Sequence, residues 1–197
     1  MKHRASILVL LMVVLAPAMS ATAQEGAPDQ QAAMEAWMKA ATPGEIHSFL
    51  AKKAGKWTVV SKMWMEPGGE PTVSESSVEA EMILGGRFLR EDMSGMSMGL
   101  PFQGMGITGY DNTTGKITSV WFDTMGTVTS ILSGAYATAG DPMVLTGSMI
   151  DPMTGMEMSM RAVTNFISAD ESRFEYFASG TGMPEMKIME LHYSRVK

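Results

Sequence analysis

The stretch GMGITGYDNTTGKITSVWFDT, residues 104–124, decides the fold. On both sides of its centre, apolar or aromatic residues alternate with polar or small ones, which is typical of half-buried β-strands. At the centre, Asp111 can accept hydrogen bonds from the backbone ahead of it, and Gly115 can take the left-handed conformation that closes a tight turn. The stretch therefore predicts a β-hairpin with strands at 104–110 and 117–124.

The same pattern recurs on both sides of this hairpin, and Asp151 to Gly155 repeats the design of its loop. The connections are too short for the crossover that parallel strands need, so consecutive strands are expected to pair antiparallel. The predicted strands are 56–65, 72–84, 87–93, 104–110, 117–124, 128–138, 143–150, 157–167, 173–179 and 185–195. They predict a mainly β protein, an antiparallel up-and-down barrel of about ten strands, because closure leaves no exposed sheet edge.

A short helical segment is predicted before the barrel. In residues 30–41 the apolar Met34, Trp37 and Met38 lie at helical spacing, and a second short helix is expected at 45–53, ended by Gly55. Residues 24–44 are therefore predicted to form a partly helical arm, and residues 45–197 a single barrel domain.

The first 23 residues have the layout of a secretory signal peptide. Lys2 and Arg4 precede an apolar run over 5–15, and Ala21-Thr22-Ala23 fits a cleavage site. The run is shorter than the roughly 20 residues of a spanning helix, although an uncleaved anchor is the alternative. We expect cleavage after Ala23 and a periplasmic or secreted protein.

Composition excludes several classes of function. The chain has no cysteine, which excludes disulfides, thiol nucleophiles and Cys-based metal sites. Its formal charge of −6, without basic clusters, argues against nucleic acid and anionic membrane surfaces. No cofactor is predicted, and the oligomeric state is left open.

Gly55-Lys56-Trp57 opens the first strand, and Arg195 ends the last. This pattern is similar to the lipocalin-type signature, in which the Trp plugs the closed end of a barrel and the Arg packs over its indole. The alternative is that Trp57 is an ordinary core aromatic.

Longer strings carry a more specific resemblance: ILGGRFL (83–89), GLPFQGMG (99–106), GYD (109–111) and VWFD (120–123). In this order, with the Gly55-x-Trp57 start, the sequence resembles the bacterial domain-of-unknown-function family 1579, from about Glu45 to Arg195. The resemblance implies a calycin-like barrel and no established activity.

Polar residues within these strings are the candidate ligand-binding groups. Arg87 and Glu91 are expected on one strand face, and Trp121 and Asp123 on another. If both faces point inward, an arginine with two carboxylates must be paired, and the group could hold the polar head of an apolar or amphipathic ligand. The alternatives are a structural ion pair at one barrel end, surface placement, or an enzyme pocket using Arg87, Glu91 and Asp123.

Methionine offers a second hypothesis, since the chain has 22 of them. Two sequence clusters stand out as soft ligands for Cu(I) or Ag(I). They are Met93, Met96 and Met98, expected in a loop, and Met153, Met156, Met158 and Met160, in and after a turn. The alternatives are core packing and sacrificial oxidation to sulfoxide.

Histidine contributes little. His47 lies on the predicted second helix, and His192 lies on the last strand, where it is either a surface or rim residue or a conceivable haem ligand. The leading hypothesis is therefore a non-catalytic exported barrel that binds a small apolar or amphipathic ligand.

Overall fold

The computed structural model describes residues 29–197, so the predicted signal peptide and the first residues of the arm lie outside the described part of the chain. Two helices, α1 (Gln30–Ala41) and α2 (Glu45–Ala51), precede the sheet. Asp29 caps α1 by accepting a hydrogen bond from the backbone of Gln31. No helix within residues 29–197 is both long and apolar enough to cross a bilayer.

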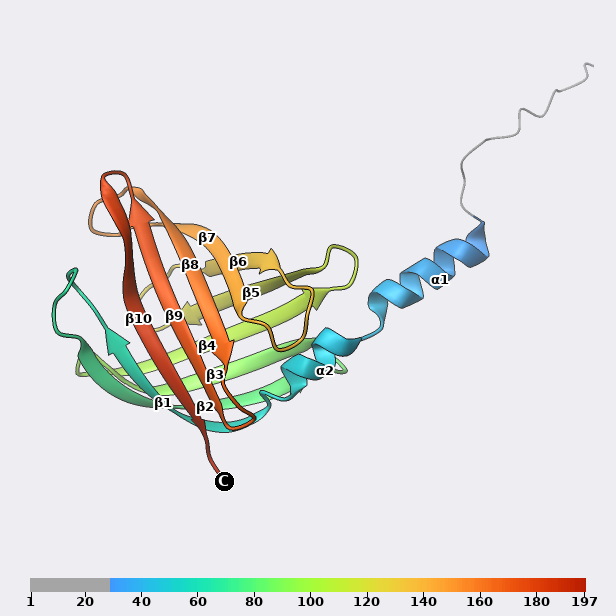
Figure 1. Ribbon diagram of the computed structural model, residues 1–197, viewed down its shortest axis with the longest axis horizontal. Coiled ribbons are helices and arrows are strands. Elements are labelled where there is room, and N and C mark those ends of the chain that lie inside the picture. Colours follow the sequence, from blue (N-terminus) through green and yellow to red (C-terminus); the bar gives the residue numbers. More distant parts are fainter. Residues whose placement is uncertain (1–28) are drawn as a thin grey trace, which may run out of the picture.

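The rest of the chain forms a closed barrel in which each strand pairs antiparallel with its sequence neighbours, and the first pairs with the last (Figure 1). The ten strands are β1 (Gly55–Met63), β2 (Thr72–Ile83), β3 (Phe88–Ser97), β4 (Leu100–Asp111), β5 (Lys116–Asp123), β6 (Ser130–Ala135), β7 (Met143–Ile150), β8 (Glu157–Phe166), β9 (Glu171–Gly180) and β10 (Met183–Arg195). The predicted ten-stranded antiparallel barrel is confirmed.

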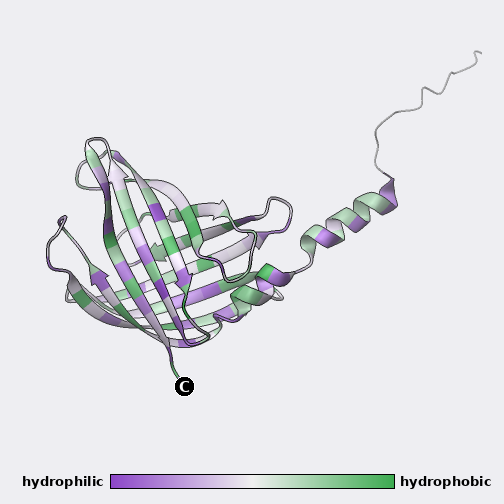
Figure 2. Cartoon of the chain, in the orientation of Figure 1, coloured by the Kyte–Doolittle hydropathy of each residue, from purple (hydrophilic) through white to green (hydrophobic). Residues whose placement is uncertain are grey.

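Alternation of apolar and polar residues along each strand fills the barrel interior (Figure 2). Val59, Val78, Leu89 and Ile117 are almost fully buried on its inner face. Helix α2 closes one end, where Leu50 is buried and Ile46 joins the core of β5–β9. The barrel therefore has one end closed by α2 and an opposite end where the inward side chains are less covered.

Helix α1 extends away from the barrel and has no buried residue (Figure 1). Its C-terminal end is held by two side chains of the barrel. The Asn112 amide donates hydrogen bonds to the carbonyls of Ala40 and Thr42, at 3.0 and 2.8 Å, and the Arg87 guanidinium donates to the carbonyl of Ala41 at 2.8 Å. The arm is thus joined to the barrel at the β2–β3 and β4–β5 connections.

The two Asp–Gly loops have the predicted geometry. Asp111 accepts hydrogen bonds from the backbone of Thr113 and the hydroxyl of Thr114, and Asp151 accepts the equivalent pair. Gly115 and Gly155 both have positive φ, at 67° and 71°. These hydrogen bonds lower the pKa of both carboxyl groups.

The expectation of a loop over residues 93–98 is wrong. Strand β3 continues to Ser97, and β4 begins at Leu100, so only Met98 and Gly99 form the turn. Both have positive φ, at 50° and 79°, as the tightest hairpin turns require. Glycine at the second position lets both strands continue up to the turn. The Ser- and Gly-rich sequence before the turn does not indicate a strand there.

Candidate functional site

At the closed end, Gly55, Trp57 and Arg195 lie together. The Arg195 guanidinium lies 4.1 Å from the centre of the buried Trp57 indole, within the range of cation–π attraction. It also donates hydrogen bonds to the carbonyls of Lys52 and Ala54. Gly55 has a φ of 128°, and a Cβ there would lie 2.7 Å from Arg195 Nη1, so the site requires glycine. This group joins the start of β1 to the end of β10.

Glu91 points into the barrel beside this group. Its carboxylate forms an ion pair with Lys53 at 3.4 Å, and both side chains are largely buried. The Lys53 ammonium also lies 5.0 Å from the centre of the Tyr193 ring. Burial, with the nearby charge of Glu91, raises the pKa of Tyr193. Lys53 therefore serves as the partner of Glu91, as in the structural ion pair that the sequence left open.

Trp121 and Asp123 also face the interior, from β5. The indole Nε1 of Trp121 donates a 2.8 Å hydrogen bond to one oxygen of Asp123, and the other oxygen accepts from the backbone of Met125. The six-membered ring of Trp121 lies over Gly104 and Gly106 of β4, where a Cβ at Gly104 would overlap it. The two glycines thus make room for the indole.

Arg87 does not join these carboxylates. It lies in the turn before β3, where its guanidinium donates to the carbonyls of Leu84 and Ala41. Among residues 29–197 it forms no ion pair with Glu91 or Asp123. The strand begins one residue later than predicted, so Arg87 and Glu91 do not share one strand face. Of the four candidate residues, only Glu91, Trp121 and Asp123 face the interior.

The methionines of each sequence cluster lie in different environments. Met93 is buried inside β3, whereas Met96 and Met98 are exposed on the outer face and in the turn. Met153 and Met156 are exposed in the β7–β8 loop, whereas Met158 and Met160 pack inside the barrel. Neither cluster therefore gathers its thioethers at one point.

Both described histidines are accounted for without a ligand. His47 is buried, and its Nδ1 accepts a hydrogen bond from the backbone of Gly44 at the start of α2. Burial lowers its pKa. His192 is exposed and pairs across the sheet with Val60 and Arg173, on the outer face. No group of three or more His, Asp or Glu side chains in residues 29–197 has the geometry of a metal site.

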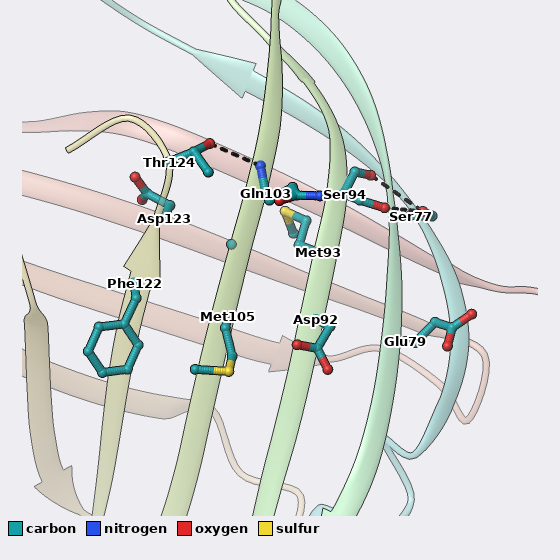
Figure 3. Close-up of a pocket in the computed structure, with 11 residues that line it drawn as sticks. Ser77, Glu79, Asp92, Met93, Ser94, Gln103, Met105, Phe122, Asp123 and Thr124 are labelled. Atoms are coloured by element: carbon teal, nitrogen blue, oxygen red, sulfur yellow. Dashed lines mark hydrogen bonds between the residues drawn. The ribbon is translucent and has the colours of Figure 1, made fainter. Parts of the chain in front are cut away.

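The outer face of β2–β5 carries a shallow groove of about 550 Å³ (Figure 3). One row of outward residues crosses it in strand order: Glu79, Asp92, Met105 and Phe122. Asp92 is already paired with Arg90 at 2.9 Å. The groove is open to solvent. Trp121 and Glu91 do not line it, but Asp123 does, so Asp123 belongs both to this groove and to the pair with Trp121.

A sequence model of the family DUF1579, "Protein of unknown function", matches residues 42–195. The chain belongs to the DUF1579 family. No curated protein shows significant sequence similarity to it. Among solved structures, this DUF1579 chain is similar to the crystal structure of Rv2717c from M. tuberculosis, with 18% sequence identity and a TM-score of 0.57. The match covers 79% of this chain and all of Rv2717c, and it supports the barrel fold alone.

Two features of the DUF1579 barrel escaped the sequence reasoning. Lys53, two residues after α2, could not be identified from the sequence as the partner of Glu91, because the contact depends on how the helix closes the barrel. The role of Gly104 and Gly106 was also missed, although a signal existed. Two glycines at i and i+2 on one strand face leave a gap, and the adjacent predicted strand offered Trp121 to fill it.

Proposed function

We propose that this DUF1579 protein is exported and binds a small amphipathic ligand at the open end of its barrel. The ligand's cationic or hydrogen-bond-donating head would lie at Asp123, and its apolar part would lie against Trp121. The observation that carries the proposal is the inward placement of an aromatic ring beside a carboxylate that has no cationic partner among residues 29–197.

The arrangement of Trp121 favours such a ligand. Its six-membered ring lies flat over the two glycines of β4, so the opposite face of the ring is turned toward the interior. Trp121 packs against the buried core without being buried itself. A flat aromatic surface over an apolar floor is a common lining of small-molecule sites.

Asp123 supplies the polar end of the site. Each of its oxygens accepts one hydrogen bond from the protein, which fixes the carboxylate and leaves lone pairs free for a ligand. A carboxylate next to an indole is suited to a cation, since the charge and the ring face both attract it. An ammonium or guanidinium head is therefore favoured over an anionic one.

Export is supported by the signal-like residues 1–23. It is tested by expressing the full gene and sequencing the N-terminus of the protein recovered from the periplasm. We expect the mature chain to begin at Gln24. Recovery only from the cytoplasm with residues 1–23 intact would contradict export.

Ligand binding is tested with dodecyltrimethylammonium and dodecyl sulfate, each below its micelle concentration, using tryptophan fluorescence. We expect saturable binding that favours the cationic amphiphile. Asp123→Asn should remove that preference, while Asp92→Asn, on the outer face, should retain it. Native mass spectrometry of freshly purified protein would then identify any ligand that remains bound. Binding that is not saturable, or equal binding of both amphiphiles, would refute the proposed site.

A further inference from the structure

At the open end of the barrel, methionines from two separate hairpins lie on one patch. This set as a whole differs from both methionine clusters of the sequence. We define the rim methionines as Met149, Met158, Met160, Met183 and Met186, from β7, β8 and β10. In Figure 1 the β7–β8 and β9–β10 hairpins lie next to each other, at the end of the barrel away from α2. The register of these strands places the five residues on one patch of the inner face.

Cross-strand pairing defines this patch. Met149 is directly opposite Met158, at a spacing where side chains are in contact. On β9, Gly180 pairs with Met183 and its open side lies against Met158, whose Cγ is 3.8 Å from where a Cβ would be. Met158 and Met183 therefore flank a glycine.

The next row of the sheet repeats the arrangement. Ala178 pairs with Met160 on one side and with Met186 on the other. Met183 and Met186 are three residues apart and would normally face opposite sides of the sheet, but a bulge in β10 between them returns both to the inner face. Four methionines thus flank two small residues on the inner face: Met158 and Met183 on either side of Gly180, and Met160 and Met186 on either side of the buried Ala178.

Most of the rim methionines are not fully covered. Met160 is buried, but Met149, Met158, Met183 and Met186 remain partly exposed. Met149 and Met158 pack against the core of β5–β9, but their side chains are only partly covered at the mouth of the barrel. Thioethers that are gathered and accessible are soft, neutral ligands.

We propose that the rim methionines form a binding site for a monovalent soft metal ion, Cu(I) or Ag(I), coordinated by thioether sulfurs. Flexible methionine side chains on both sides of Gly180 and Ala178 can turn toward a common point above them. Binding involves no change in oxidation state and releases no proton, because thioethers do not titrate. Affinity is therefore expected to be nearly constant from pH 5 to 7.5, unlike that of a histidine or cysteine site.

The test uses the full protein labelled with ¹³C at the methionine methyl groups and titrated with silver nitrate in chloride-free buffer. We expect the methyl resonances of the rim methionines to shift together and saturate at one Ag(I) per chain. Single Met→Leu variants assign the resonances. Shifts confined to the exposed Met96, Met98, Met153 and Met156 would overturn the proposal. So would the absence of any saturable shift, a result that needs no variant.

A matched pair of double variants gives an independent test. Met158→Leu with Met183→Leu removes thioethers from both sides of Gly180, and leucine conserves the side-chain volume closely. Affinity should fall by more than roughly tenfold, the loss that even outer-shell partners of metal ligands cause. The control, Met153→Leu with Met156→Leu, should bind as the natural chain does. Equal affinity of the two variants would overturn the site, whatever the amphiphile titrations at Asp123 show.

Discussion

The guanidinium of Arg195 stacks 4.1 Å from the centre of the Trp57 indole, so that the end of the last strand covers the start of the first. The same guanidinium donates to the carbonyls of Lys52, Ala54 and Ala169 and pairs with Asp170 at 3.2 Å. A planar, multidentate cation is needed to satisfy the ring and the carbonyls together. Arg195 therefore joins α2, β1 and the β8–β9 connection at the closed end of the barrel.

Arg195→Lys should accordingly destabilise the protein, because an ammonium retains the charge but cannot make the stacked, forked contacts. We expect a loss of about 1–3 kcal/mol in the free energy of unfolding, measured by urea denaturation. The control is Arg173→Lys, which changes an arginine whose pair with Glu175 lies at 3.7 Å on the outer face and should cost less than about 1 kcal/mol. Equal losses for the two variants would contradict the role of Arg195.

Gly104→Ala tests whether the packing of the Trp121 indole depends on the missing side chain at Gly104. The new Cβ would overlap the indole, so the ring must move or the two strands must separate. We expect a loss of about 1–3 kcal/mol, as for other overpacked interiors, and a shift in the tryptophan emission spectrum. Gly126→Ala is the control, since a Cβ there lies 3.9 Å from its nearest neighbour. A fully stable Gly104→Ala protein with unchanged emission would show that Trp121 does not depend on this glycine.

The hairpins could be predicted from the sequence more completely than the candidate site. Strand number, pairing and the two Asp–Gly loops were predictable because they depend on local alternation and on residues that form the turn themselves. The group around Trp121 and Asp123 was only half predictable. Alternation places both on one face, but only closure of the barrel makes that face the inner one.

The positions of Arg87 and of the methionines could not be predicted from the sequence. The sequence placed Arg87 on a strand with Glu91, but the turn at Gly85–Gly86 extends to it and directs its side chain to the end of α1. Methionines close in sequence separate to the two faces of β3, whereas Met158 and Met183, 25 positions apart, flank Gly180. Register and bulges decide these contacts, and neither is readable from spacing alone.

The burial of His47 predicts a pH-dependent stability. Its pKa in the folded protein is lowered mainly by desolvation, and the charge of Arg87 acts in the same direction. As pH falls below the ordinary value of 6.5, the unfolded chain takes up a proton that the folded protein resists, so stability falls. Urea denaturation at pH 7.5 and 5.5 should show this loss, while both pH values stay above the range where the carboxylates titrate.

His47→Gln is the matched variant, because a glutamine can accept the hydrogen bond from Gly44 but does not titrate. We expect it to be less stable than the natural chain at pH 7.5 and to lose less stability between pH 7.5 and 5.5. If both proteins lose the same amount over this interval, another group controls the pH dependence.

The contacts that hold α1 can be removed while the barrel stays folded. Since α1 buries no residue, its position depends on the hydrogen bonds from Asn112 and Arg87 to its C-terminal carbonyls. Replacing both with alanine should free the helix, seen as faster hydrogen exchange over residues 30–41 and lower fluorescence anisotropy at the exposed Trp37. The barrel should nearly keep its unfolding midpoint, because within the barrel the two substitutions remove only the exposed hydrogen bond from Arg87 to the carbonyl of Leu84. Unchanged exchange in α1, or a barrel that loses stability with it, would show that the arm and barrel are joined by more than these contacts.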